Sequence, residues 1–354
     1  MKKIIFFITS AVVGITLFVG VILKVGLPSI WQTIVDFSFA KWFVILFLYA
    51  LAFFITQYRW YLILRSLGQP VKLSQILPAK IVGFSVDYIT PSPNVGGEAI
   101  RAMVLKKDAG VPLSDGLASV IIDKLMDFSY ALPFLLFSIF YVLIKFSLSW
   151  KLIAGLLFIS LLFIFLIAFF YYRTLRARDF FGSIIRFFQL HKLSFVAKVM
   201  DKIGAFELIV IKFFRHDRRT LYRGLGLSVL GGIVTLSAMW SIMLFLGLPA
   251  TFLDVILVST LTVVTFLLPI PGSFGSTETG EALIFSLIGF SPESGVAFSL
   301  IFRSVDFLKV VIGLLFLSHF GIKIGQTLFS KAPPQANGNG QNGHPLTTPT
   351  EPVK

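Results

Sequence analysis

Two groups of ionisable residues lie inside or beside long apolar stretches of this sequence. The first group consists of Glu98, Arg101, Asp123, Lys124 and Asp127. The second group consists of Glu278, Arg303 and Asp306. Ionisable groups are costly in hydrocarbon, by roughly 2.5–3.5 kcal/mol on insertion scales, so they usually face a bundle interior or a wet cavity. The cations Arg101, Lys124 and Arg303 could hold an anionic head group, and the carboxylates would balance them or carry a proton.

Each group adjoins a segment in which Pro and Gly interrupt a hydrophobic stretch. The interrupting residues are Pro91, Pro93, Gly96 and Gly97 in the first segment, and Pro269, Pro271, Gly272 and Gly275 in the second. Such breaks free backbone groups, and the N-terminus of a following helix offers N–H donors to an anion. The neighbouring stretches Ile76–Thr90 and Ala282–Phe290 are too short to cross a bilayer comfortably. We expect them to form half-helices or re-entrant segments.

The two groups look like copies of each other. Matching residues are separated by 178 to 180 positions: Pro91 and Pro269, Pro93 and Pro271, Glu98 and Glu278, Lys124 and Arg303, Asp127 and Asp306. In both copies a cation and a carboxylate stand at i and i+3, on one helix face. Interrupted hydrophobic segments at matching positions of two halves are the best sequence pointer to a transporter-type site. The pattern therefore predicts an internal repeat that brings buried ions together around a polar head group.

A purely structural interpretation competes with this one. Each i, i+3 pair could be a neutralised pair that lets a polar helix insert and pack. For the duplicated set the functional interpretation is favoured, because packing alone does not explain two matched breaks. Asp87, Asp254 and Glu281 are interpreted as wetted charges near the ends of spans, and the stripe Ser259, Thr262 and Thr265 as helix–helix contacts.

The composition is that of an integral membrane protein. Hydrophobic residues make up 56% of the chain and charged residues 14%, against about 25% charged in an ordinary soluble domain. The expected spans are Ile4–Leu23, Trp42–Leu64, Leu117–Ile144, Leu152–Tyr172, Gly224–Gly247, Phe252–Pro269 and Val296–Phe320. A cleaved signal peptide is the alternative for the first span, but its length favours a retained helix. The fold class is an all-α polytopic transmembrane helix bundle of about 7–9 spans, including the two short segments.

The distribution of charge predicts the orientation. The loop 173–223 holds twelve Lys and Arg against four acids, so this loop and the N-terminus should face the cytoplasm, in a cell (inner) membrane. Within it, Asp179–Phe188 and Phe195–Phe214 are interpreted as basic amphipathic helices on an anionic leaflet, or as an ordinary helical hairpin. A nucleic-acid partner is excluded by the lack of a soluble basic domain. The predicted domains are a transmembrane domain, 1–330, and a disordered Pro-, Gly- and Asn-rich tail, 331–354.

No pattern for a metal, a cofactor or a catalytic reaction is present. The sequence has no Cys, and its four His (His191, His216, His319 and His344) lack metal-ligand spacing. Neither a P-loop nor a Gly-x-Ser-x-Gly elbow occurs. We therefore expect no metal and no cofactor, and an enzymatic role is disfavoured without being excluded.

At these motifs the sequence resembles the lysylphosphatidylglycerol synthase transmembrane-region family, also called the flippase-like domain family. Its Gly-Glu-x-x-Arg element is matched by Gly97–Arg101, and its Glu-Arg-x-x-Asp-like element by Asp123–Asp127. A Pro-Gly-Gly-x-Gly-x-x-Glu element is matched by Pro271–Glu278, and a helical Arg by Arg303. The likeness extends to about residue 325. The chain departs from the pattern where Asp-Lys replaces Glu-Arg at 123–124 and where Ser273 replaces a Gly.

The resemblance implies a membrane domain that handles lipid. In related multiple peptide resistance factors such a domain flips aminoacylated phospholipid made by a separate synthase domain, and no segment after Lys331 could fold into that domain. We therefore expect translocation of an anionic phospholipid or a polyprenyl phosphate. Two alternatives stay open. One is a membrane-embedded transferase acting on lipid-linked head groups, and the other is a non-transporting membrane partner of a soluble enzyme that docks on the loop 173–223.

Overall fold

The chain forms a bundle of α-helices. The computed structural model describes residues 37–90, 96–145, 150–176, 200–265 and 270–320, with a few isolated positions elsewhere. The helices are α3 (Phe39–Ser66), α4 (Leu73–Ile89), α5 (Gly97–Ala109), α6 (Leu113–Lys145), α7 (Trp150–Leu175), α10 (Met200–His216), α11 (Arg218–Phe245), α12 (Phe252–Thr265), α13 (Ser276–Leu287) and α14 (Pro292–Phe320), with a short 3-10 turn, η2 (Pro271–Ser273), before α13. No strand occurs in these ranges. The predicted all-α membrane bundle is confirmed.

Four of these helices are long and apolar enough to cross a bilayer. They are Phe39–Ser66, Leu113–Lys145, Ile153–Thr174 and Arg218–Phe245, and each contains one of the expected spans or most of it. Many of their large apolar side chains are exposed, including Phe47, Phe54, Phe140 and Phe158. Exposed aromatic and aliphatic side chains on such helices suit contact with lipid. The expected span Ile4–Leu23 and the tail 331–354 lie outside the described residues.

The order of the helices repeats. In each half a long helix is followed by a short helix, a break, a second short helix and another long helix. The starting residues of the matched helices, Phe39 and Arg218, Leu73 and Phe252, Gly97 and Ser276, Leu113 and Pro292, are each 179 positions apart. The contacts repeat too, since α4 packs on α14 while α12 packs on α6. The described helices thus form two structural repeats, α3–α6 and α11–α14.

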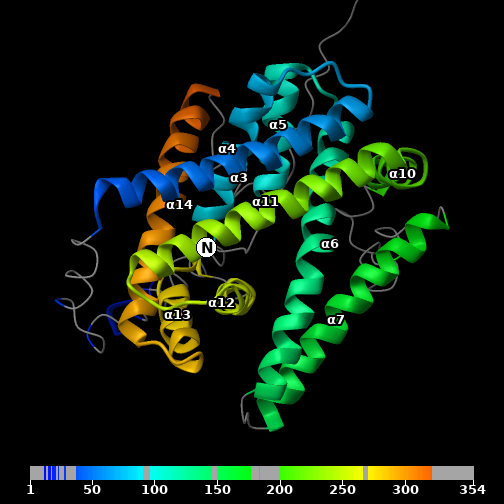
Figure 1. Ribbon diagram of the computed structural model, residues 1–354. Helices are drawn as coiled ribbons and strands as arrows, with labels where there is room; N and C mark the ends of the chain where they lie inside the picture. Colours follow the sequence, from blue (N-terminus) through cyan, green and yellow to red (C-terminus); the bar gives the residue numbers. More distant parts are fainter. Residues whose placement is uncertain are drawn as a thin grey trace, which may run out of the picture. The chain divides into compact units, whose positions relative to one another are not determined.

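The two repeats run in opposite directions. At one end Lys41 Nζ of α3 donates to the carbonyl oxygen of Phe245, 3.1 Å away, at the end of α11. At the other end Ser66 and Asp217, which caps the start of α11, line the same small pocket. The matched helices α3 and α11 are therefore antiparallel, and α6 and α14 also run in opposite directions (Figure 1). Because α3 and α11 both have the length of a span, the repeats are inverted with respect to each other.

Close packing between α3 and α11 depends on small residues. A Cβ at Gly231 would lie 3.2 Å from Thr56 Cγ2, so the two backbones approach closely at this point. Nearer the end where Lys41 contacts Phe245, buried side chains of both helices join α13 and α14 in one hydrophobic core. This core contains Ile45, Met239, Phe285 and Phe298. Small residues at helix crossings are a common device for packing in membranes.

The short helices of each repeat form an antiparallel hairpin. At the tip of the first hairpin the Gly97 N–H donates to Asp87 Oδ1 at 2.7 Å, and at its open end Gln75 Nε2 donates to the carbonyl oxygen of Asp108 at 3.4 Å. In the second hairpin Thr262 of α12 bonds Glu281 of α13. The stretch expected to span at Phe252–Pro269 is helical up to Thr265. At 14 residues, or about 21 Å, α12 is too short to cross alone and pairs with α13 instead.

The basic loop includes a helix that covers the bundle. In α10 the apolar residues Phe206, Val210, Phe213 and Phe214 belong to a core cluster shared with α6 and α7. The predicted amphipathic helix at Phe195–Phe214 is thus present from Met200, and part of its apolar face packs on protein instead of lipid. The other predicted helix, Asp179–Phe188, lies outside the described residues.

Candidate functional site

Glu98 and Glu278 lie in the first turns of the matched helices α5 and α13, offset by one residue, and make matching contacts. Each carboxylate accepts a backbone N–H at the start of its own helix: Gly96 N lies 3.0 Å from Glu98 Oε2, and Gly275 N lies 2.7 Å from Glu278 Oε2. Each also pairs with a cation of the next long helix, Glu98 with Lys124 and Glu278 with Arg303. The sequence correspondence at these four positions is therefore also a correspondence of structure.

Arg303 holds the tip of the second hairpin in place. Its guanidinium lies 2.7 Å from Glu278 Oε1 and donates to the carbonyl oxygens of Ser273, at 3.1 Å, and Gly272. It also lies 4.1 Å from the centre of the Phe274 ring and 3.3 Å from the hydroxyl of Tyr88, on α4 of the other repeat. Arg303 thus connects the two repeats.

A larger ion network lies at the centre of the first repeat. Asp123 is 2% exposed and accepts from Arg59 Nε at 2.8 Å and from Arg101 at 2.9 Å, while Lys80 Nζ lies 3.9 Å away. Arg59, fully buried, also donates to Asp127 at 2.5 and 2.9 Å. The network joins α3, α4, α5 and α6. Removing one member of such a buried set leaves uncompensated charge, so the network stabilises the arrangement of these helices.

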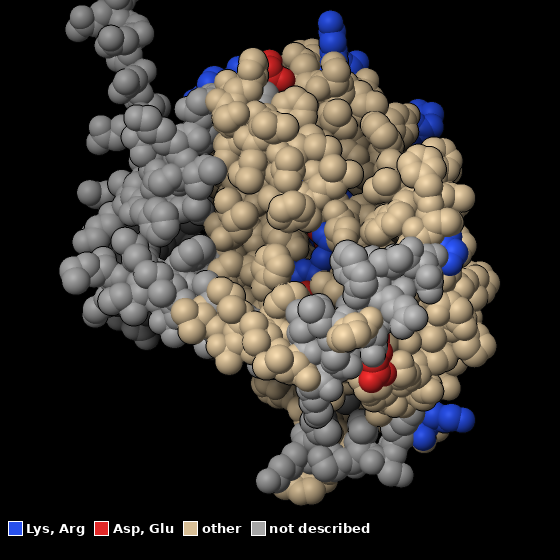
Figure 2. All heavy atoms as spheres, turned by 90° about the vertical axis from the view of Figure 1, so that its left-hand side faces the viewer, with Lys and Arg blue, Asp and Glu red and all other residues tan. Residues whose placement is uncertain are grey.

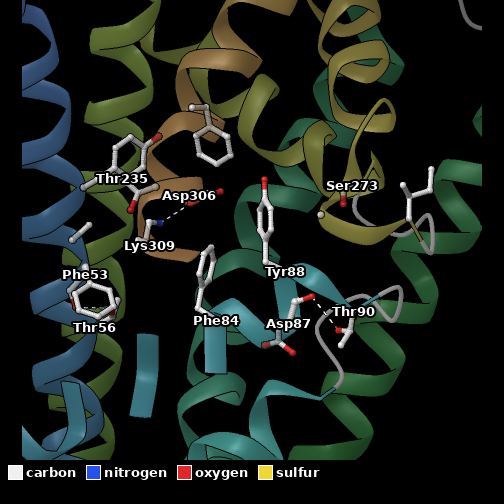
Figure 3. Close-up of a pocket in the computed structure, with 15 residues that line it drawn as sticks. Phe53, Thr56, Phe84, Asp87, Tyr88, Thr90, Thr235, Ser273, Asp306 and Lys309 are labelled. Atoms are coloured by element: carbon white, nitrogen blue, oxygen red, sulfur yellow. Dashed lines mark hydrogen bonds and ion pairs between the residues drawn. The ribbon is translucent and has the colours of Figure 1, made fainter. Parts of the chain in front are cut away.

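The tips of both hairpins line one cavity of about 410 Å³, cavity 1. Its polar lining includes Asp87, Tyr88 and Thr90 from the first hairpin, Ser273 from the second, and Asp306 and Lys309 from α14 (Figure 3). Lys309 Nζ lies 2.6 Å from Asp306 Oδ1 and 4.8 Å from the centre of the Phe84 ring. On one face of the molecule, basic and acidic atoms are visible in a hollow whose immediate surroundings are mostly uncharged (Figure 2). Cavity 1 offers a cation, carboxylates and hydroxyls beside aromatic walls.

A second cavity of about 380 Å³, cavity 2, corresponds to the first through the repeat. Seven pairs of residues 179 positions apart line the two cavities: Tyr49 and Ser228, Ala52 and Gly231, Phe53 and Gly232, Thr56 and Thr235, Phe84 and Val263, Asp306 and Asp127, Lys309 and Tyr130. Thr56 and Thr235 correspond to each other through the repeat and lie at the crossing of α3 and α11, and each of them lines both cavities. The two cavities are thus repeat-related and meet at this pair of threonines.

Some of the predicted site residues line a cavity, whereas the predicted head-group cations do not. Gly272 and Asp306 line cavity 1, and Asp127 lines cavity 2. The predicted head-group cations, Arg101, Lys124 and Arg303, do not line either cavity. Arg303 lies directly behind the wall formed by Gly272 and Tyr88. The head-group role of these three cations stays a prediction.

Other predicted positions have structural roles or cannot be placed. Gly96 and Gly97 begin α5, and Pro271, Gly272 and Gly275 form the turn before α13. Pro91, Pro93 and Pro269 lie outside the described residues. Within the described ranges no cluster of His, Asp or Glu has the arrangement of a metal site.

Some residues of the site were missed or misjudged from the sequence. Arg59 and Lys309 were missed, although Arg59 is an ionisable residue inside an apolar span and Lys309 stands three residues after Asp306. Glu281, interpreted as a wetted charge, is 1% exposed, because α13 lies inside the bundle. Asp254 does lie at the exposed start of α12, where it accepts from Thr251.

Comparison with known proteins identifies the family. Residues 7–313 match the family described as the lysylphosphatidylglycerol synthase TM region, which covers both repeats as far as the middle of α14. The chain belongs to this family. This membership confirms the resemblance seen in the sequence motifs and establishes a membrane protein.

Relatives in the lysylphosphatidylglycerol synthase TM region family match over most of their length. The UPF0104 membrane protein of Methanothermobacter thermautotrophicus is 24% identical over 90% of this chain and 97% of its own. Those of Methanocaldococcus jannaschii and Pyrococcus horikoshii are 25% and 23% identical, over 86% and 84% of this chain and 92% and 91% of theirs. No solved structure matches.

Proposed function

We propose that this protein moves lipids that carry a phosphate-containing head group between the leaflets of its membrane. The observation that supports this most is the pair of repeat-related cavities, which belong to inverted repeats and meet at Thr56 and Thr235. Inverted repeats with helices broken near the middle of the bundle are the usual architecture of transporters with alternating access. Each cavity is lined by residues of both repeats, and together the two provide a compartment for a head group on each side of the α3–α11 crossing.

Cavity 1 has the chemistry to bind such a head group. Lys309 can donate to a phosphate oxygen as a point charge, and the positive charge of Arg303 lies directly behind Gly272. Asp87 and the hydroxyls of Tyr88 and Thr90 can bind the hydroxyl or amine groups that phospholipid head groups carry. Because the outward faces of α3 and α6 are apolar, the acyl or polyprenyl chains would remain in lipid while the head group moves.

The ends of the bundle support the predicted orientation. One end carries Arg65, Lys72, Lys106, Lys107, Arg218 and Arg219 with the acids Asp108, Asp115 and Asp217, whereas the opposite end carries Lys41 and Lys145 with the acids Asp254 and Glu293. By the positive-inside bias the first end faces the cytoplasm. The first hairpin then enters from the cytoplasmic side and the second from the opposite side, as re-entrant hairpins.

Reconstitution tests the proposal. The purified protein is placed in vesicles of phosphatidylethanolamine and phosphatidylglycerol that contain phosphatidylglycerol with a fluorescent acyl chain, and a membrane-impermeant reductant quenches the outer leaflet. Quenching of the inner pool over time measures translocation. In Lys309→Met this rate should fall about tenfold or more, since a charge-assisted hydrogen bond contributes about 1.5–3 kcal/mol. The matched control is Lys106→Met, at the exposed end of α5, which should keep the wild-type rate.

The same vesicles separate the alternatives. Equal rates in Lys309→Met and the wild type would exclude cavity 1 as the head-group site. Mass spectrometry of the lipids distinguishes a transferase, because a covalently altered lipid formed from an added donor, without any change in leaflet distribution, would contradict translocation.

A further inference from the structure

Glu281 is a buried carboxylic acid with an incomplete set of partners. It lies on α13 and is 1% exposed. Thr262 Oγ1 of α12 donates to its Oε1 at 2.5 Å. Its other oxygen, Oε2, is buried and has no hydrogen-bond partner among the described residues. A buried carboxylate oxygen without a donor is strongly disfavoured in the ionised form.

Most other carboxylates of the site pair with a cation, and Asp87 accepts the backbone N–H of Gly97 instead. Glu278 binds Arg303, Asp306 binds Lys309, and Asp123 and Asp127 bind Arg59. Glu281 makes no ion pair with any described residue, since the described ion pairs involve other acids. Burial without a cation favours the neutral, protonated form of a carboxyl group.

Tyr49 of α3 belongs to the same core cluster as Ile284 and Phe285 of α13, the helix that carries Glu281. Its ring lines cavity 1, and its hydroxyl is buried without a hydrogen-bond partner among the described residues. The charged groups on the helices packed around α13 are few: Glu278 on α13 itself, Asp254 at the start of α12, and Glu293, Arg303, Asp306 and Lys309 on α14. Tyr49 therefore connects the core around α13 to the wall of cavity 1.

We infer that Glu281 is a proton-binding site coupled to lipid movement, an inference that rests on the proposed function. In the state seen here Glu281 holds the proton while Asp306 is ionised and paired with Lys309. When a head-group phosphate forms an ion pair with Lys309, Asp306 loses its cation. The Tyr49 hydroxyl must then move within hydrogen-bond distance of both carboxyl groups, so that the Glu281 proton passes to the Tyr49 oxygen while the Tyr49 hydroxyl proton passes to Asp306. Asp306 becomes neutral and Glu281 becomes ionised. When the lipid leaves and Lys309 is free again, Asp306 releases its proton to water on the side where the lipid is delivered, and Glu281 takes up a proton from the other side before the next cycle.

The test uses the same vesicles with a pH gradient. If one proton moves with each lipid, labelled phosphatidylglycerol should reach a leaflet ratio of up to about tenfold for each pH unit of gradient. In Glu281→Gln, which keeps the size of the side chain and cannot ionise, this ratio should fall to one while exchange between leaflets continues. Tyr49→Phe, which lacks the hydroxyl, should reduce the response in the same way. Glu293→Gln, the same change at the start of α14, is the control and should respond as the wild type does.

A second measurement does not depend on transport. The infrared spectrum of the wild type at neutral pH should contain a carboxylic-acid carbonyl band that is absent from Glu281→Gln and present in Glu293→Gln. An identical spectrum in Glu281→Gln, or a leaflet ratio that follows the gradient in that variant, would overturn the inference and leave lipid translocation intact. If neither the wild type nor any variant moves the labelled lipid, the proposed function is wrong. The infrared band alone then decides whether Glu281 holds a proton.

Discussion

At the scale of single residues, Ser273 carries a conformation that its side chain disfavours. Its φ is +51°, and it is the only described residue other than Gly with a positive φ. The left-handed region costs an L-residue about 1–2 kcal/mol. This explains why the family motif has Gly here: the tip must turn so that the carbonyl oxygens of Gly272 and Ser273 meet Arg303.

Ser273→Gly should therefore stabilise the protein. The side-chain hydroxyl has no described hydrogen bond, while the carbonyl oxygen of Ser273, which accepts from Arg303, remains after substitution. We expect a gain of about 1 kcal/mol, reduced by the greater freedom of Gly in the unfolded chain. Thermal unfolding in detergent measures this as a raised Tm. A lowered Tm would show that the Ser273 side chain contributes contacts that outweigh the strain.

At the scale of helices, the hairpins depend on close backbone approach that only Gly allows. A Cβ at Gly97 would lie 2.2 Å from the carbonyl oxygen of Gly83 and 2.5 Å from Asp87 Oδ2. Gly83 is equally crowded by the stem of Arg101, whose Cγ would lie 2.2 Å from an added Cβ. The first hairpin is therefore locked by two facing glycines, and its tip positions Asp87 at cavity 1.

Gly97→Ala should open this hairpin. Overpacking of this kind costs about 1–3 kcal/mol, and here the clash is with backbone that cannot rotate away. We expect a lower Tm together with slower lipid translocation. Gly155→Ala, on α7 where an added Cβ would meet nothing within 4 Å, is the control, and it should keep or slightly raise stability because Ala favours helix. A wild-type Tm in Gly97→Ala would mean that the backbones of α4 and α5 do not need this close approach.

The sequence could reveal the repeat but not the contacts made between helices. The breaks and the recurring acids and cations were readable because type and spacing recur along the chain. The spacing suggested i, i+3 pairs of each cation with Asp127 or Asp306, whereas Lys124 pairs with Glu98 and Arg303 with Glu278. The partners of Arg59 could not be predicted in this way, because Asp123 and Asp127 lie on α6 and Ser228 lies on α11, far from Arg59 in the sequence. Which charges pair is decided by helix packing, and no local periodicity encodes it. The burial of Glu281 was misjudged for the same reason, because the sequence does not show which short helix lies inside the bundle.

At the scale of the whole molecule, the inverted arrangement makes a prediction about sidedness. The open ends of the two hairpins lie at opposite ends of the bundle, because α3 and α11 are antiparallel. If both hairpins are re-entrant, residues at their open ends must be accessible from opposite sides of the membrane. The alternative, in which one short helix of a pair crosses alone, would place the two ends of the same hairpin on different sides.

The chain has no Cys, so single cysteines can report this directly. Lys72→Cys and Lys107→Cys, at the two ends of the first hairpin, should react with a membrane-impermeant maleimide from the cytoplasmic side alone. Thr251→Cys and Glu293→Cys, at the end of the bundle where the second hairpin opens, should react from the opposite side alone. Inside-out and right-side-out vesicles provide the two exposures, and labelling after detergent solubilisation shows that each cysteine is reactive. Labelling of Lys72→Cys and Lys107→Cys from different sides would mean that the first hairpin crosses the membrane, and the two cavities could not then act as compartments on opposite sides of one α3–α11 crossing.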